Sequence, residues 1–261
     1  MMRYLVRLIW NENLKMLYRT STLVMSGGLI ALIFLTFALD RWYNPFYIGY
    51  WQAVASQSWL SIFIAMIAVI LASRTIADEF QWGTIKLLLI RPAGRSTILW
   101  AKFCAVLSFS LLLLVVLLIC SMVLNLIFQP QDVTEPSVFS TGEKGNGSPW
   151  PMVLKLYALR MVEIGIYAGL SFMISALFKS VALATGITFF LMIFGSEIAN
   201  QLGTSGLSRF FLFHHTGLSQ FAQWNATDSA FTLFESLVIV IIHLLIFYGI
   251  AWLCFTKQDV F

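Results

Sequence analysis

The sequence contains few charged residues, and this scarcity defines the class of protein. Only 11% of its 261 residues are Asp, Glu, Lys or Arg, whereas 59% are hydrophobic, and the mean hydropathy is +0.85. Soluble domains carry about 25% charged residues, so a chain of this length and balance has more apolar surface than one aqueous core can bury. The composition excludes a soluble globular domain and predicts a membrane protein.

The residue patterns of nucleotide and metal chemistry are also missing. A Walker A motif needs a Gly-Lys pair, because backbone N–H groups and the lysine together hold the phosphates, and the chain contains no Gly-Lys pair. The three cysteines lie at wide spacing within hydrophobic runs, which indicates neither disulfides nor a metal site. His214-His215 is expected to be exposed and lacks the i, i+4 spacing of a helical zinc pair. We therefore expect no enzymatic activity, no bound cofactor and no metal site in this chain.

Six hydrophobic runs are long enough to cross a bilayer. A transmembrane helix needs about 20 apolar residues to cross about 30 Å of hydrocarbon. The longest run after residue 150 contains a single charge, Lys179, at which we divide it into two spans joined by a short turn. The predicted spans are residues 20–39, 58–73, 103–128, 157–178, 181–199 and 234–255. The predicted fold class is all-α: one polytopic domain with six transmembrane helices.

The distribution of Lys and Arg predicts the orientation. With the N-terminus inside, eleven of the sixteen basic residues lie in inside segments and five lie outside. Cytoplasmic loops are enriched in Lys and Arg. We therefore expect both termini of this multi-pass protein to lie in the cytoplasm. The membrane is expected to be a bacterial cytoplasmic membrane.

Two segments outside the spans have patterns of their own. In residues 1–19 a basic residue or Asn recurs every four positions, opposite apolar residues that include Trp10, which is typical of an amphipathic helix lying in the headgroup layer; the alternative is a frayed tail. Residues 200–232 contain an apolar stretch too short to span and broken by glycines. They predict an interfacial or re-entrant pair of short helices on the outside.

The charged segment between the second and third spans, residues 77–95, is the most informative stretch. Its order is an acid, Gly-Thr, an apolar turn, Arg-Pro and a second Arg, followed by Lys102. Pro92 disfavours helix at the residue before it, so a short helix starting near Asp78 is expected to end by Ile90. The residues of this pattern are Glu79, Gly83, Thr84, Leu87, Leu88, Arg91, Pro92 and Arg95. The alternative is a positive loop with no partner.

This segment resembles the first cytoplasmic loop of ABC-2-type transporter permeases. The resemblance covers the whole chain in layout and specific residues only in this loop. It implies that residues 77–95 form a coupling helix that docks on a separate ABC ATPase, which uses ATP and Mg²⁺. It also implies a second permease copy or paralogue, and export of a hydrophobic or amphipathic cargo such as an antibiotic, a peptide or a lipid. The alternatives are an ion-gradient-driven secondary transporter and a non-transporting membrane interaction protein.

Three ionisable residues within or at the ends of spans are candidates for the substrate path or a dimer interface. They are Glu163, Glu197 and His243. A charge in hydrocarbon costs about 2.5–3.5 kcal/mol on insertion scales, so it tends to face a partner or a cavity. For Glu163, which we expect about two turns from the outer end of its span, the alternative is a pair with Arg160 that reaches the headgroups. For His243 the alternative is a hydrogen bond between helices.

Overall fold

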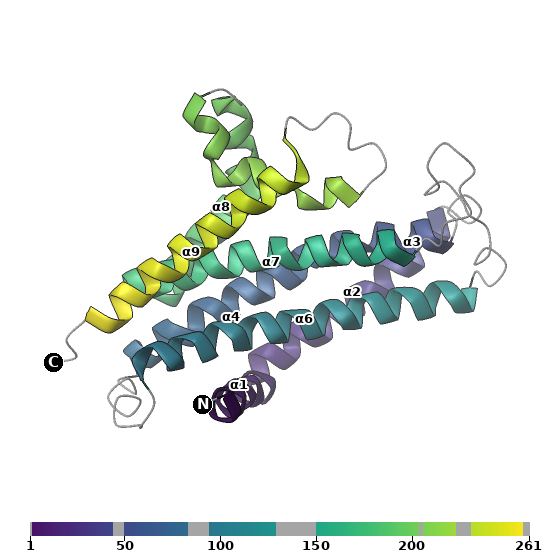
Figure 1. Cartoon of the computed structure of the whole chain (residues 1–261). Helices are drawn as coiled ribbons and strands as arrows, with labels where there is room; N and C mark the ends of the chain where they lie inside the picture. Colours follow the sequence, from purple (N-terminus) through teal and green to yellow (C-terminus); the bar gives the residue numbers. More distant parts are fainter. Residues whose placement is uncertain are drawn as a thin grey trace.

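The computed structural model describes residues 2–43, 50–82, 94–128, 150–203, 206–222 and 231–257. Within these ranges the regular secondary structure is helical, and six helices are long and apolar enough to cross a membrane (Figure 1). They are α2 (Thr20–Tyr43), α4 (Ser61–Gln81), α6 (Arg95–Phe128), α7 (Trp150–Phe178), α8 (Val181–Leu202) and α9 (Leu233–Lys257). The prediction of an all-α polytopic membrane protein with six spans is confirmed.

Most helices are longer than the predicted spans. Helix α7 begins at Trp150 rather than at residue 157, and α6 begins at Arg95 rather than at 103. Helix α3 (Tyr50–Ser56) and the 3₁₀ turn η1 (Gln57–Leu60) lead directly into α4. Hydropathy marks only the part of a helix that fits the hydrocarbon, whereas backbone hydrogen bonding continues through polar residues into the headgroup layer.

Helices α4 and α7 form the centre of the bundle. In their most apolar windows 67% of the residues are buried, compared with 22–28% in the other four spans. Small side chains let the two helices approach, and two serines of α7 join them: the Ser171 hydroxyl donates to the Val69 carbonyl at 2.9 Å and the Ser175 hydroxyl to the Ser73 carbonyl at 2.5 Å. Within a bilayer the hydrophobic effect does not drive helices together, so hydrogen bonds between helices and close packing stabilise their association.

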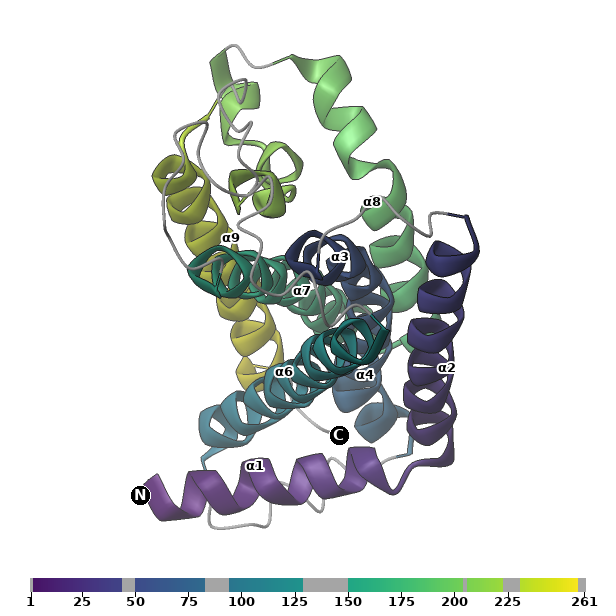
Figure 2. The same cartoon turned by 90° about the vertical axis from the view of Figure 1, so that its right-hand side faces the viewer.

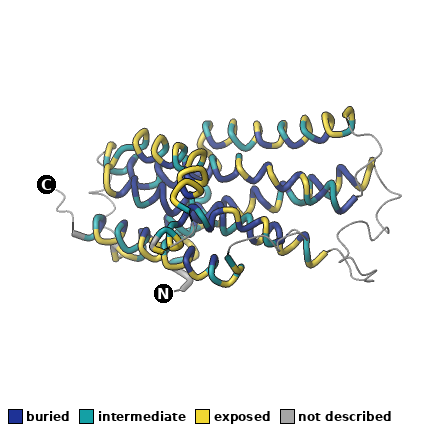
Figure 3. The backbone as a smooth tube through the Cα atoms, turned by 90° about the horizontal axis from the view of Figure 1, so that it is seen from above, coloured by how far each residue is buried: buried dark blue, intermediate teal, exposed yellow. Residues whose placement is uncertain are grey.

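A glycine of α7 allows a second close approach, to α9. A Cβ atom on Gly169 would lie 2.9 Å from Leu244 Cδ2. Helix α9 begins with a capping box, in which the Glu235 N–H donates to the Thr232 hydroxyl at 3.2 Å and the Thr232 N–H donates to Glu235 Oε2 at 3.0 Å. Large apolar side chains of the peripheral helices, such as Leu35 and Leu245, are exposed, and Figure 3 shows exposed positions along the peripheral helices. In a membrane protein these faces contact lipid or another subunit.

Helix α1 and the last residues of α9 lie at one end of the bundle, which we call the near end; the opposite end is the far end (Figure 1). Helix α1 (Met2–Leu17) crosses the near end beneath the other helices (Figure 2). At the far end, α8 and α9 are joined by three 3₁₀ turns, η2 (Gly206–Phe210), η3 (Leu212–His215) and η4 (Leu218–Ala222). The connection therefore contains three short turns in its described part, where a pair of short helices was predicted.

The structure corrects the predicted start of the coupling helix. Asp78 and Glu79 do not begin a new helix, because α4 continues without interruption to Gln81. The hydrogen-bond pattern of α4 continues past both residues, and the Trp82 N–H donates to the Asp78 carbonyl at 2.9 Å. The predicted residues Gly83, Thr84, Leu87, Leu88, Arg91 and Pro92 lie outside the described residues, and Arg95 is the first residue of α6.

Candidate functional site

Charged side chains from three helices meet at the near end. We call Glu12, Arg19, Asp78, Glu79 and Lys102 the near-end charge cluster. Lys102 of α6 is its centre and is only 2% exposed. Its ammonium donates to Glu79 Oε1 and, at 3.2 Å, to the Thr75 carbonyl, both on α4, and it lies 3.6 Å from Glu12 Oε2 on α1. A buried cation must be paired and hydrogen-bonded, and this cluster satisfies that requirement with groups from two other helices.

Further polar contacts hold α1 against the bundle. Arg19, just after α1, pairs with Asp78 at 2.6 Å. Asn13 donates to the Ser108 hydroxyl of α6 at 2.8 Å. A further bond, from Arg74 to the Ser21 hydroxyl at 2.8 Å, joins α4 to α2. Helix α1 is therefore held against α6, and Arg19, which follows α1, is held against the end of α4.

The electrostatics of Glu12 follow from the same contacts. Burial raises the pKa of Glu12, but Lys102 and Lys15 outweigh burial, so the pKa falls below its usual value. The Lys15 ammonium lies 2.7 Å from Glu12 Oε1. Glu12 is thus a carboxylate at neutral pH, as its place beside Lys102 requires.

The turn between α7 and α8 lies beside the end of α4. Lys179 adopts a left-handed conformation there, with φ of 52°, and its ammonium lies 4.9 Å from the ring centroid of Phe80. The Gln81 amide donates to the Lys179 carbonyl at 3.4 Å. The last turn of α4 therefore contacts Arg19 just after α1, Lys102 of α6 and the α7–α8 turn. A movement of the last turn of α4 would displace all three.

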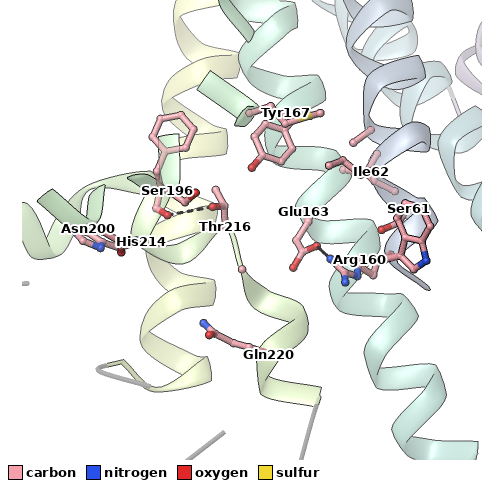
Figure 4. Close-up of a pocket in the computed structure, with 16 residues that line it drawn as sticks. Ser61, Ile62, Arg160, Glu163, Tyr167, Ser196, Asn200, His214, Thr216 and Gln220 are labelled. Carbon is pink, nitrogen blue, oxygen red and sulfur yellow. Dashed lines mark hydrogen bonds and ion pairs between the residues drawn. The ribbon is translucent and has the colours of Figure 1, made fainter. Parts of the chain in front are cut away.

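The far end contains a cavity of about 490 Å³. Side chains from η1, α4, α7, α8 and the α8–α9 connection line it. Figure 4 shows Arg160 and Glu163 side by side on α7, Tyr167 above them, and His214, Thr216 and Gln220 across the cavity. The volume is within the range of about 300–1,000 Å³ for small-molecule sites, which are largely apolar with a few convergent polar groups.

Glu163 is the polar centre of this cavity wall. It is 8% exposed; Oε2 accepts from Arg160 Nη1 at 2.8 Å, and Oε1 accepts from the Ser219 N–H at 2.7 Å. The first N–H groups of a helical turn have no partner within the turn, so Glu163 satisfies the start of η4. Lys155, two turns earlier on α7, satisfies its end by donating to the Phe221 carbonyl at 2.9 Å. Helix α7 thus holds η4 at both ends.

His215 fixes the same connection to α9, which corrects the expectation that His214-His215 is exposed. His215 is 1% exposed, with Nε2 2.9 Å from the Arg209 carbonyl and Nδ1 3.0 Å from the Ser236 hydroxyl. A carbonyl only accepts, so Nε2 carries the proton and Nδ1 accepts from Ser236. Burial lowers the pKa of His215 despite the opposing hydrogen bond to the Arg209 carbonyl. The three 3₁₀ turns fold against α7, α8 and α9 and bury His215, although its polar side chain predicts an exposed position.

The three candidate residues within spans do not share one site. Glu163 lines the cavity, and its pair with Arg160 is the alternative that the sequence offered; the contact with Ser219 is additional. Glu197 is exposed on α8 and does not line the cavity. His243 is half-buried, and its Nδ1 donates to the Ile239 carbonyl of its own helix at 2.8 Å, so the hydrogen bond lies within α9 rather than between helices.

Sequence reasoning missed several members of both sites. The sequence prediction did not include Glu12. It is the acidic residue of the otherwise basic segment 1–19 and directly follows Asn11, one of the polar residues that recur every four positions. Arg160 was noted only as a partner for Glu163, and nothing in the sequence indicates that Tyr167 and Gln220 face the same space. Lys102 carried a signal, because it is the charge at the border of the predicted 103–128 span.

The six apolar helices, with charged groups placed at both ends of the bundle, define a multi-pass α-helical membrane protein. The chain belongs to the family described as "Protein of unknown function (DUF2705)", whose model matches residues 21–261. It is 32% identical to "Uncharacterized protein YhcI" of Bacillus subtilis (strain 168) over 215 residues. The matched region covers 80% of this chain and 69% of that protein. It is 28% identical to "Uncharacterized membrane protein YdbK" of the same organism over 236 residues. That match covers 88% of this chain and 90% of the relative.

Proposed function

We propose that this chain is the membrane-spanning permease subunit of an ATP-driven exporter of the ABC-2 type. It performs no chemistry itself, and ATP and Mg²⁺ are used by a separate ABC ATPase. A second permease copy or a paralogue completes the pathway in a bacterial cytoplasmic membrane, with the near end in the cytoplasm. The cargo is hydrophobic or amphipathic, such as an antibiotic, a peptide or a lipid.

The observation that supports this proposal most directly is the buried pair of Lys102 and Glu79. These residues lie on either side of residues 82–94, the connection that resembles a coupling loop, and the pair joins the two helices that flank it. Because the pair ties the two flanking helices together, a force that a partner applies to the loop would move both helices as one.

The same contacts define what such a force would move. A displacement of residues 82–94 reaches α4 and α6 through Lys102 and Glu79, and reaches α1 through Glu12 and Arg19. Helix α4 packs on α7 through the two serine hydroxyls, and α7 carries Glu163 at the cavity. ATP would bias this assembly between two conformations by making different contacts in each.

Residues 87–95 contain the groups that would contact the ATPase. Burial of Leu87, Leu88 and Leu89 in a groove contributes about 1.5–3 kcal/mol for each side chain. Arg91 and Arg95 pair with acids on the partner through charge-assisted hydrogen bonds.

Co-purification with the ATPase tests the proposal. The cognate ATPase is sought first among neighbouring genes and is expressed together with the tagged chain. Leu88→Asp and Arg95→Glu are expected to lower ATPase recovery by at least about tenfold and to abolish transport-linked ATP turnover, since a charge in an apolar groove and a reversed charge each cost more than about 1.4 kcal/mol. Arg209→Gln, which removes the charge of an exposed arginine of the α8–α9 connection without placing a second acid beside Glu235, is the control and leaves both unchanged.

Full ATPase binding and full transport in both variants would refute the coupling role and favour an ion-gradient-driven transporter. A chain that binds no ATPase and moves no cargo would favour a non-transporting interaction protein.

A further inference from the structure

The far-end cavity has hydrogen-bonding capacity that the protein itself does not use. Arg160 presents five N–H donors and no acceptor, and Nη1 donates to Glu163. Its Nε atom is buried and has no hydrogen-bond partner among the described residues, and the same holds for His214 Nε2 on the opposite wall. Residues on two opposite walls of the cavity therefore carry nitrogen atoms whose hydrogen-bonding capacity the described protein leaves unused. An unpaired buried polar group costs about 1–3 kcal/mol, so these walls favour a ligand that can accept hydrogen bonds.

The charges of the wall favour an anion over a cation. Each oxygen of the Glu163 carboxylate already accepts a strong hydrogen bond, one from Arg160 and one from the Ser219 N–H. Its negative charge is therefore compensated before any ligand arrives. Arg160 retains a free donor edge, and a guanidinium edge matches carboxylate and phosphate groups.

The exposed residues of the cavity wall lie on three sides of it. Trp59 of η1 and Ile62 of α4 are 47% and 45% exposed, and Ser196 and Asn200 of α8 and Gly217 and Gln220 of the α8–α9 connection are also exposed. We take the space between α4 and α8 as the mouth of the cavity. An opening between spans faces the side of the bundle, where lipid tails or another subunit lie, and Ile62 and Met192 give it apolar walls. A ligand that enters there needs an apolar part.

The depth of Arg160 agrees with a headgroup at this site. We take Lys179, the charged residue of the α7–α8 turn, as the near boundary of the membrane. At 1.5 Å per residue, Arg160 lies about 27 Å from Phe178 along α7, and the hydrocarbon is about 30 Å thick. Arg160 is therefore level with the border between acyl chains and phosphates at the far side.

We propose that the far-end cavity binds the negatively charged headgroup, a phosphate or carboxylate, of an amphipathic molecule whose tail leaves through the mouth between Ile62 and Met192. Arg160 is the anchoring cation and His214 donates from the opposite wall. Glu163 is a positioning residue: it holds the guanidinium in place and fixes η4, which closes the cavity. Binding at this site does not depend on the coupling of residues 82–94 to an ATPase, so the two proposals fail separately.

Binding to the purified full-length chain in neutral detergent tests the site, with native mass spectrometry as the readout. The probes are dioleoylphosphatidylglycerol, dioleoylglycerol, dodecyl phosphate and inorganic phosphate. The phospholipid or dodecyl phosphate is expected to bind at least about tenfold more tightly than dioleoylglycerol, the difference that one or two charge-assisted hydrogen bonds supply. Binding of phosphatidylglycerol assigns a membrane phospholipid to the site; binding of dodecyl phosphate alone assigns a single-chain amphiphile, as an exported cargo would be.

The decisive variant removes both charges of the ion pair together. Arg160→Gln with Glu163→Gln leaves no uncompensated buried charge and is expected to abolish the preference for the phosphate headgroup. Arg209→Gln with Glu235→Gln is the matched control, because that pair has the same 2.8 Å separation outside the cavity; it keeps the preference. His214→Phe retains the ion pair and lowers headgroup affinity at least about threefold by removing one donor, which provides the test if the double variant does not fold.

Three results would overturn the proposal. Equal binding of dioleoylglycerol and phosphatidylglycerol would show that the headgroup is not recognised. Inorganic phosphate binding as tightly as dodecyl phosphate would show that the tail contributes nothing. Unchanged binding in the cavity variants would place the ligand elsewhere on the protein.

Discussion

Replacement of Lys102 by Met tests whether the near-end charge cluster stabilises the protein. Met keeps the length and apolar stem of Lys and removes only the ammonium. The Lys102 side chain is 3% exposed, and its partners Glu79 and Glu12 are 17% and 15% exposed, so water cannot replace the lost cation easily. Removal of one partner from a buried ion pair costs about 3–5 kcal/mol, because the other charge is left uncompensated.

The size of the effect follows from the free energy of unfolding. For a chain of about this size, 1 kcal/mol shifts the unfolding temperature by about 2–4 °C. Lys102→Met is therefore expected to lower it by about 6–20 °C in detergent. Lys102→Met combined with Glu79→Gln leaves no unpaired charge at Glu79 and is expected to recover most of the loss. Lys15→Met is the matched control: Lys15 pairs with Glu12 but is 58% exposed, so the expected cost is below about 1 kcal/mol.

A second measurement reports directly on the attachment of α1. Cysteines at Asn13 and Ser108, whose side chains touch at 2.8 Å, are introduced into a chain without its native cysteines and oxidised. Cross-linking is expected to be efficient in the parent and to fall in Lys102→Met. Equal unfolding temperatures for Lys102→Met and Lys15→Met, or no recovery in the double variant, would show that the cluster does not act as a buried pair.

Three further predictions concern packing, pH and orientation. Gly195→Ala is expected to destabilise the far end by about 1–3 kcal/mol, because its Cβ would clash with the ring of Phe213 in η3. Gly186→Ala on the same helix meets nothing within 4 Å and is the control, with unfolding temperature as the measurement. The pKa of His215 is lowered from 6.5, so its contribution to stability is complete above pH 6.5 and is lost as pH falls toward the folded-state pKa; His215→Gln is expected to remove this part of the pH dependence of unfolding, and an unchanged profile would contradict the assignment. Cysteines at Gly142 are expected to react with an impermeant thiol reagent added to intact cells, whereas cysteines at Ala93 are not; labelling of Ala93 would reverse the proposed orientation.

Glu163→Gln connects stability with the proposed transport. A glutamine has one acceptor oxygen, whereas Glu163 uses two, so one of its hydrogen bonds to Arg160 and Ser219 is lost. The expected cost is about 1.5–3 kcal/mol, the contribution of a hydrogen bond to a charged group. Glu197→Gln, on an exposed residue of α8, is the control for expression and unfolding temperature. We expect Glu163→Gln to reach the membrane and to transport less; unchanged export would leave Glu163 with a structural role only.

Much of this protein is determined by its sequence alone. Hydrophobic runs of sufficient length predicted six helices, because in hydrocarbon every backbone group must be bonded within its own segment and a helix is the simplest solution. The single Lys179 located the α7–α8 turn, since a charge in the middle of a long apolar run is too costly to leave in lipid. These features depend on composition and on local hydrogen bonding, which a sequence states directly.

Only the tertiary structure decided which polar residues meet. Glu12 and Lys102 are far apart in the chain and become neighbours because α1 crosses the near end. His215 is buried because three 3₁₀ turns fold back onto α7, α8 and α9, and the cavity beside Glu163 exists because α7 holds η4 at both ends. In a chain where most residues are apolar, hydropathy is nearly the same on every face of a helix. The packing of small side chains and a few long-range polar contacts therefore determine how the helices are arranged.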